Sequence, residues 1–373
     1  MELVISYSLE KERKRILKNC KKCGKCAKIC PSIEIGGIDR LKFSEIQKYL
    51  YDFVTNPKKN EIVSKRIDSC LECFKCVDSC PNDINPLSYI EIAKSLSYQN
   101  EYAPYVNCDP GNFASQNRSL ENELTKKESK SVLTSTDYSN KKIVFFPGCN
   151  VYNHSPRLLK TKAVLDLLDN DTAFIPGTKY CCGDRYLFDG RLQEGEEQYH
   201  NLVSEIQKYN PDTIVFWCPT CLARMKKTWG NEMNCVSFFQ FCHENISKLN
   251  FLKPNQNLSV TLHEPCKTTY TKIDDSHRSV INAIPGLSLT EMASGTKCCG
   301  SGGISYFKDR TIEVLTHNRL SEAKKTGAEV LITICHYCQE LFESENETNN
   351  IKIVNLIDLI HSKLEPASLI KEN

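Results

Sequence analysis

The chain has 373 residues, 40% of them hydrophobic, which is enough for two or three domains with cores of their own. Its 48 basic residues nearly balance its 46 acidic ones, so composition gives no general reason to expect binding to nucleic acid or to an anionic membrane. No stretch approaches the eighteen consecutive apolar residues of a membrane span. We therefore expect a soluble protein that reaches a membrane only through a partner.

Cysteine is the unusual component, with 21 residues. The opening segment MELVISYSLEKERKR has no apolar run followed by a small-residue cleavage site, so no secretory signal is predicted. These thiols are then expected in a reducing cytoplasm, where regularly spaced cysteines indicate metal ligation or catalysis more than disulfides.

Residues 1–102 are predicted to be helical, because segments 41–54 and 86–96 place apolar residues three and four apart. They contain two cysteine runs displaced by 50 residues, each fitting C-x2-C-x2-C-x3-C-P, the pattern of bacterial two-cluster ferredoxins. In that pattern the fourth cysteine of each run serves the other cluster. One [4Fe–4S] cluster is therefore assigned to Cys20, Cys23, Cys26 and Cys80, and the second to Cys70, Cys73, Cys76 and Cys30. Structural zinc is the alternative, disfavoured by two complete runs that both end in proline.

A basic segment surrounds the first cysteine run. Between Lys11 and Lys28 there are nine lysines and arginines against one acid, Glu12. The segment is interpreted either as a solvated face or as a docking patch for an acidic redox partner.

Residues 103–141 are polar, rich in serine and asparagine, and lack sustained apolar periodicity, so they are predicted to be a linker. Beyond them, short apolar runs at 142–148, 212–218, 258–265 and 329–335 alternate with helix-like segments such as 157–168 and 311–327. This alternation predicts α/β architecture with a largely parallel sheet in each of two duplicated domains, residues 142–256 and 257–373. The whole chain is thus expected to be a multidomain α+β protein with a helical ferredoxin-like domain at residues 1–102.

The duplication is visible in ten cysteines displaced by 117 residues. The first set is Cys149, Cys181, Cys182, Cys218 and Cys221, and the second is Cys266, Cys298, Cys299, Cys335 and Cys338. Each set contains an adjacent pair followed by glycine, which suits a tight turn that brings both thiolates to one centre. Most of the other cysteines follow apolar runs, at the carboxyl edge of a sheet where α/β proteins build their sites. Zinc or plain packing is the alternative, but five cysteines exceed a tetrahedral zinc site. The remaining Cys108, Cys235 and Cys242 are interpreted as incidental.

Both repeats resemble the CCG domain of heterodisulfide reductase catalytic subunits and of the iron-sulfur subunits of glycerol-3-phosphate, glycolate and lactate oxidising systems. The resemblance covers nearly the whole chain, and a ferredoxin head ahead of two CCG repeats is similar to the D-type subunit. It implies that each five-cysteine set holds a noncubane [4Fe–4S] cluster, the two clusters facing one another across a disulfide substrate. Four clusters are therefore expected, two cubane and two noncubane. The CxxC of the second repeat, CHYC, departs from the commoner proline-containing form seen as CPTC in the first.

The function expected from these features is disulfide reduction, with all ten repeat cysteines at the catalytic centres. The alternative is an electron conduit from a flavin-dependent glycerol-3-phosphate, glycolate or lactate dehydrogenase to quinone. No nucleotide-binding fingerprint is present, so no flavin or NAD is expected on this chain. Electrons must come from a partner such as a flavoprotein, a cytochrome b or a hydrogenase-type subunit. Location is expected in the cytoplasm or on the inner face of the membrane. Five side chains near the cysteines are candidates for moving protons or orienting substrate: His154, His263, Glu264, Lys267 and His336.

Overall fold

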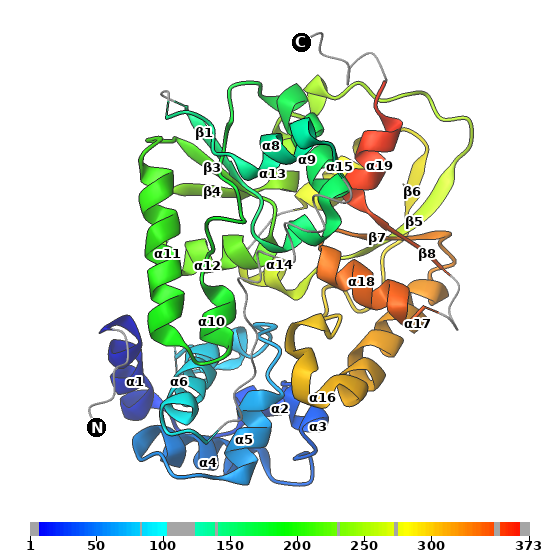
Figure 1. Ribbon diagram of the computed structural model, residues 1–373. Coiled ribbons are helices and arrows are strands. Elements are labelled where there is room, and N and C mark those ends of the chain that lie inside the picture. Colours follow the sequence, from blue (N-terminus) through cyan, green and yellow to red (C-terminus); the bar gives the residue numbers. More distant parts are fainter. Residues whose placement is uncertain are drawn as a thin grey trace. The chain divides into compact units, whose positions relative to one another are not determined.

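The computed structural model describes residues 7–82, 84–102, 124–138, 141–229, 232–271, 275–346 and 351–365. The chain forms two compact units (Figure 1). The first comprises residues 1–110, 183–197 and 298–318, and the second comprises residues 111–182, 198–297 and 319–373.

The first unit is helical. Its helix α4 buries Ile46, Leu50 and Phe53 along one face, as the three-and-four spacing of its apolar residues requires. Helix α6 is buried along almost its whole length. The elements of this unit are α1 (Tyr7–Asn19), α2 (Lys25–Lys28), α3 (Ser32–Ile35), α4 (Phe43–Thr55), α5 (Glu61–Asp68), η1 (Val77–Ser79), α6 (Pro86–Gln99), α10 (Asp184–Phe188), η4 (Ser301–Gly303), α16 (Ile304–Thr311) and the π-helical η5 (Ile312–Thr316).

The two four-cysteine runs have the same backbone path. Lys22 and Glu72, which occupy equivalent places, both have positive φ, at 55° and 48°. The next pair of equivalent residues, Gly24 and Phe74, also has positive φ, at 77° and 60°. Left-handed residues turn the chain sharply between cysteines, so each run curls around a small volume.

The second unit contains two four-stranded parallel sheets with the same strand order, β2-β1-β3-β4 and β6-β5-β7-β8. Their central strands are short runs of Val, Ile, Leu and Phe that are buried on both faces, as parallel strands covered by helices must be. The strands are β1 (Ile143–Phe146), β2 (Ala173–Phe174), β3 (Thr213–Phe216), β4 (Asn234–Ser237), β5 (Leu258–His263), β6 (Leu287–Leu289), β7 (Val330–Thr333) and β8 (Lys352–Asn355).

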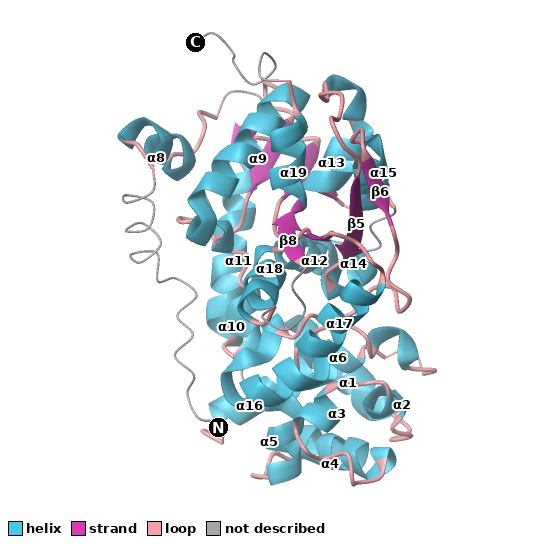
Figure 2. Ribbon diagram, turned by 90° about the vertical axis from the view of Figure 1, so that its right-hand side faces the viewer, coloured by secondary structure: helices cyan, strands magenta, loops and turns pink. Residues whose placement is uncertain are grey.

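Helices pair the two repeats across one shared core. Helix α9 packs on α19, and α13 packs on α15, where α15 and α19 are the second-repeat counterparts of α9 and α13 (Figure 2). One hydrophobic cluster therefore runs through both repeats, from Phe145 and Trp217 to Leu262 and Ile332. The helices of this unit are α8 (Lys126–Leu133), η2 (Asn150–His154), α9 (Ser155–Leu168), α12 (Pro219–Trp229), α13 (Phe238–Glu244), η3 (Ile246–Lys248), α14 (Cys266–Thr271), α15 (Ser276–Ala283), α18 (His336–Ser344) and α19 (Leu356–Lys363).

The segment that follows the adjacent cysteines belongs to the first unit in both repeats. In the first repeat it contains α10, and a Cβ at Gly190 would lie 2.6 Å from the carbonyl oxygen of Lys94 on α6. In the second repeat it contains η4, and a Cβ at Gly302 would lie 2.8 Å from the carbonyl oxygen of Leu71. Two helices, α11 (Leu192–Gln207) and α17 (His317–Lys325), then carry the chain into the second unit.

The predicted fold class is confirmed: a helical ferredoxin-like part precedes two α/β repeats with parallel sheets. The compact units nevertheless cut across the predicted repeat boundaries, because residues 183–197 and 298–318 belong with the helical part. Of the predicted linker, residues 103–123 lie outside the described residues, and the described remainder contains α8, which is capped by Thr125 and Glu128. Among the described helices, none has the length and apolar character needed to cross a bilayer.

Candidate functional site

Four cysteines assigned to the first ferredoxin-type centre line one cavity in the first unit. They are Cys20, Cys23, Cys26 and Cys80. Gln47 and Tyr89, both almost fully buried, close the same cavity. The Sγ atom of Cys26 lies 3.0 Å from the side-chain oxygen of Gln47, and the backbone N–H of Lys22 donates to Sγ of Cys20 at 3.4 Å. Burial raises the pKa of Cys26 to about 11, which disfavours a free thiolate at this position.

Three of the cysteines assigned to the second ferredoxin-type centre influence a buried arginine. Arg66, on α5, is 2% exposed, and its Nε and Nη1 atoms have no hydrogen-bond partner among the described residues. Burial acts to lower the pKa of Arg66, but neighbouring cysteines outweigh it and hold that pKa above its usual value. These cysteines are Cys30, Cys70, Cys76 and, from the other set, Cys26.

A buried guanidinium with unsatisfied donors is costly unless an anion faces it. The groups whose charge raises the pKa of Arg66 are cysteine thiolates, so an anionic metal-thiolate centre at these cysteines would balance Arg66. A second buried cation, Lys94 on α6, lies 3.9 Å from Glu72 and 3.5 Å from the ring centroid of Phe188. The residues present therefore fit iron-sulfur clusters, whose thiolate-ligated forms carry net negative charge.

In the first repeat, Gly148 brings the β1 loop against the CxxC of α12. Its φ is +76°, and a Cβ there would lie 3.0 Å from Cβ of Cys218 and 3.1 Å from Sγ of Cys221. Cys149, the next residue, is thereby held beside this pair. Cys182 packs in the same buried cluster as Cys218 and Cys221. A hydrogen bond with Cys221 lowers the pKa of Cys218, and one with Cys182 contributes to raising that of Cys221.

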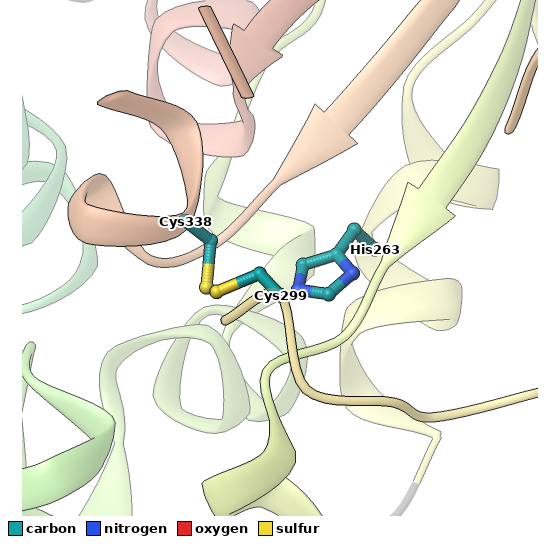
Figure 3. Close-up of side chains that lie close together, drawn as sticks. All are labelled: His263, Cys299 and Cys338. Carbon is teal, nitrogen blue, oxygen red and sulfur yellow. The ribbon is translucent and has the colours of Figure 1, made fainter. Parts of the chain in front are cut away.

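The second repeat has the same arrangement at Cys335 and Cys338 of α18, where a hydrogen bond with Cys338 lowers the pKa of Cys335. A ring nitrogen of His263, at the end of β5, lies within 4.8 Å of Sγ of Cys338 (Figure 3). The Nδ1 atom of His263 accepts a hydrogen bond from Nε of Arg319 at 3.1 Å, which leaves Nε2–H as its free donor. Burial, reinforced by Arg319, holds the pKa of His263 well below its usual value, so the ring is neutral.

His263 breaks the symmetry of the repeats. His263 ends the pairing of β5 with β7, and Phe146 ends the equivalent pairing of β1 with β3. The first repeat therefore has a phenyl ring where the second has an imidazole. Cys266 begins α14 in the second unit. The adjacent Cys298 and Cys299 belong to the first unit and are buried, and the backbone N–H of Ser301 donates to Sγ of Cys299 at 3.4 Å.

The CxxC elements of the two repeats lie close enough to interact. The charge of Cys218 acts to raise the pKa of Cys335. Beside them, the rings of His154 and His336 have centroids 6.0 Å apart, and Nε2 of His154 lies 2.6 Å from Oε1 of Glu340. His336 is 2% exposed, and neither of its ring nitrogens has a partner in the described part of the chain.

A cavity of about 320 Å³ opens next to His154, lined also by Asn153, Pro156, Arg157, Lys160 and Asp358. The other polar candidates have structural partners: Glu264 pairs with Arg278 at 2.9 Å and with His277 at 3.5 Å, and Lys267 is buried. The two repeats thus bring a pair of CxxC motifs, two histidines and a cavity into one region of the second unit.

Sequence reasoning missed Arg66, Lys94 and Arg319. For Arg66 a signal was available, because Val63, Arg66 and Ile67 all lie on the buried face of α5. For Arg319 the sequence gives no such signal, because its partner His263 is 56 residues away in the chain. Of the incidental cysteines, Cys235 and Cys242 are buried in the second unit, and Cys108 lies outside the described residues.

Comparison with protein families agrees with this arrangement. The model of the cysteine-rich CCG domain matches residues 143–226 and again residues 260–343, and that of the 4Fe-4S dicluster domain matches residues 12–85. The chain therefore contains two CCG domains and a 4Fe-4S dicluster domain. More particularly, it is an iron-sulfur oxidoreductase subunit with a dicluster domain ahead of two CCG domains, and its motifs indicate several iron-sulfur clusters.

Full-length relatives support the same class at low identity. A subunit of the fumarate reductase (CoM/CoB) of Methanothermobacter marburgensis is 26% identical, covering 92% of this chain and 72% of its own. A subunit of the dihydromethanophenazine:CoB–CoM heterodisulfide reductase of Methanosarcina barkeri is 23% identical, covering 92% and 93%. The probable glycolate oxidase iron-sulfur subunit of Bacillus subtilis is 22% identical, also covering 92% and 93%.

Proposed function

We propose that this chain reduces a small-molecule disulfide at two centres built by its CCG repeats, with electrons supplied through its ferredoxin-type part. The first centre is assigned to Cys149, Cys181, Cys182, Cys218 and Cys221, and the second to Cys266, Cys298, Cys299, Cys335 and Cys338. The electron-supplying centres are assigned to Cys20, Cys23, Cys26 and Cys80, and to Cys70, Cys73, Cys76 and Cys30.

Iron-sulfur clusters, two cubane and two noncubane, would supply single-electron transfer at these four places. The overall reaction breaks one S–S bond and consumes two electrons and two protons to give two thiols. Because each centre handles one electron, a pair of neighbouring centres suits this two-electron substrate.

The observation that carries the proposal is the closeness of the two repeats beside their cysteines: the rings of His154, from the first repeat, and His336, next to Cys335 in the second, have centroids 6.0 Å apart. It supports two centres close enough to act on the two sulfurs of one disulfide. Glu340 fixes the orientation of the His154 imidazole, which also lines a cavity. His336, buried with both nitrogens unpaired among the described residues, is a candidate hydrogen-bond partner for a bound sulfur.

A second candidate function is transfer of electrons from a flavin-dependent dehydrogenase of glycerol-3-phosphate, glycolate or lactate to quinone. The glycolate oxidase relative favours it, since its similarity extends over nearly the whole of both chains. Either role needs a redox partner protein, in line with relatives that are themselves named as subunits.

The test is anaerobic purification with iron and sulfide analysis, followed by stopped-flow reoxidation of the reduced protein. With candidate disulfides we expect the reduced absorption to be lost and two thiols to appear per two electrons. Cys218→Ala and Cys335→Ala should abolish this reoxidation. The matched control is Cys235→Ala, which removes a buried cysteine of β4 that lies outside both sets.

Reoxidation by a quinone analogue but by no disulfide would reject disulfide reduction and favour the conduit. A colourless or zinc-loaded oxygen-free preparation would reject both.

A further inference from the structure

Cys23 is the exposed member of the ferredoxin-type cysteines. Of the cysteines that the structure describes, it alone falls in the exposed class, whereas Cys70 and Cys76 of the other centre are buried. Electron transfer between proteins requires a centre close to the surface where the partner docks. The centre assigned to Cys20, Cys23, Cys26 and Cys80 therefore offers the more accessible edge of this part of the chain.

The loop that carries Cys23 is basic. Lys21, Lys25 and Lys28 are exposed, and Lys22 lies 4.0 Å from the ring centroid of Tyr51. The sequence has no acidic residue between Glu12 and Glu34, so no acid in this segment neutralises them. On α1, the acids Glu10 and Glu12 pair with arginines of the same helix, at 3.5 and 3.4 Å.

Two exposed apolar side chains adjoin the same loop. Ile29, the C-terminal cap of α2, is 39% exposed, and Phe43, the first residue of α4, is 36% exposed. Gly24 holds α4 against the cysteine loop, because a Cβ there would lie 2.4 Å from the carbonyl carbon of Phe43. An apolar centre within a charged rim is the composition of protein-protein contact sites.

We propose that the Cys23 face, made by Lys21, Cys23, Lys25, Lys28, Ile29 and Phe43, is the docking site for an acidic electron-transfer protein. This inference rests on the proposed electron-carrying role of the first unit. In each encounter the reduced partner would lose one electron to a cluster held by Cys20, Cys23, Cys26 and Cys80. Two encounters supply the two electrons that one disulfide consumes.

An acidic protein is favoured over an anionic membrane or a nucleic acid for a physical reason. The lysines and apolar residues here form a local patch around one proposed redox ligand, Cys23, and not an extended stripe of charge. Complementary charge on a partner protein chiefly raises the rate of productive encounter. Binding to anionic lipid would use the lysines without giving Cys23 a function.

The test measures reduction of the holoprotein, loaded with iron and sulfide, by a reduced acidic bacterial two-cluster ferredoxin as the probe. In stopped-flow mixing, the second-order rate constant should fall steeply as ionic strength rises. The triple variant Lys21→Glu, Lys25→Glu, Lys28→Glu should slow it by about 10-fold or more at low ionic strength. The matched control reverses three exposed lysines of α8, Lys126, Lys127 and Lys130, and should keep the wild-type rate.

A neutral reductant, photoreduced 5-deazariboflavin, should reduce all three proteins alike. Wild-type rates in the Cys23-face variant, or equal losses in both triple variants, would overturn the inference, as would binding of that face to anionic vesicles with no effect on reduction by the ferredoxin. Because this measurement involves no disulfide, failure of the docking inference can be distinguished from failure of disulfide reduction. If the reversed charges prevent cluster loading, Lys21→Gln, Lys25→Gln, Lys28→Gln should still give a smaller loss of rate.

Discussion

Arg66 places a positive charge in the interior of the first unit, facing thiols. Its buried guanidinium lies among the cysteines of both ferredoxin-type sets, and low dielectric makes such a charge act strongly. A fixed positive charge stabilises the more negative, reduced form of a neighbouring centre. We therefore expect Arg66 to raise the reduction potential of a centre held by these cysteines.

We predict that Arg66→Gln lowers the reduction potential of the centre assigned to Cys70, Cys73, Cys76 and Cys30. The measurement is a redox titration followed by low-temperature EPR. Arg66→Lys, which keeps the charge, should restore much of the potential. Lys65→Gln is the control, because Lys65 neighbours Arg66 but its side chain is 38% exposed and pairs with Glu61. An unchanged potential in Arg66→Gln would refute this role.

A second prediction at the scale of single residues concerns His263. The equivalent residue of the first repeat, Phe146, shows which substitution to make. His263→Phe copies the first repeat into the second and removes a ring nitrogen that lies within 4.8 Å of Sγ of Cys338. Since hydrogen bonds to sulfur raise the potentials of iron-sulfur centres, we expect the potential of the second CCG centre to fall and that of the first to stay. His263→Gln, which keeps a donor, should recover part of the difference in the EPR-monitored titration. Equal shifts of both centres would contradict the assignment.

At the level of elements, Gly148 in the loop after β1 packs closely against Cys218 and Cys221 of the first CCG set. Gly148→Ala adds a Cβ 3.1 Å from Sγ of Cys221 and strains a backbone with φ of +76°. We expect iron and sulfide content to fall by the equivalent of one cluster. Gly327→Ala separates the two effects, since its φ is +74° but nothing lies within 4 Å of the added Cβ. That control should cost roughly 1 kcal/mol of unfolding free energy and no iron. Full cluster content in Gly148→Ala would contradict this account.

The central strands, the main helices and the position of the cysteines at the sheet edge were predictable from sequence. Runs such as 212–218 and 329–335 are apolar, short and followed at once by CxxC, which leaves little choice of element. The edge strands β2, β4, β6 and β8 were not predicted, because two to four residues carry little periodicity and gain their structure from pairing with the central strands. Helix α8 was missed for a related reason: Val132 is its one buried residue, so its apolar signal is weak.

The candidate site was predictable as a set of ligands but not as an electrostatic environment. Fixed offsets of 50 and 117 residues identify eighteen cysteines. Arg319 reaches His263 and Lys94 reaches Glu72 only because tertiary packing brings distant segments together. Contacts of this kind leave no local pattern, so sequence reasoning could propose cysteine ligands but not the buried cations.

The two units differ in what holds them together. The second contains large clusters of buried aliphatic and aromatic residues around its sheets. In the first, the helices surround eight cysteines together with the buried cations Arg66 and Lys94. Removing metal from the first unit would leave Arg66 buried without a counterion, which is costly.

We therefore predict that anaerobic removal of iron by a chelator loosens the first unit selectively. Hydrogen–deuterium exchange with mass spectrometry should show faster exchange in α4, α5 and α6 and also in residues 183–197 and 298–318. The strands β1, β3, β5 and β7 should keep their protection. Equal loss of protection in both units would mean that the metal centres stabilise the whole chain, against this prediction.

The membership of residues 298–318 in the first unit has a consequence for biosynthesis. A ribosome releases the chain from its N-terminus, so the helical unit that begins the sequence is incomplete until most of the second unit has also been translated. Co-translational folding cannot proceed as one finished module after another. Delivery of iron and sulfide to the earliest cysteines would then be most secure after synthesis ends, and a ribosome that stalls late would release an intermediate with its thiols exposed to oxidation.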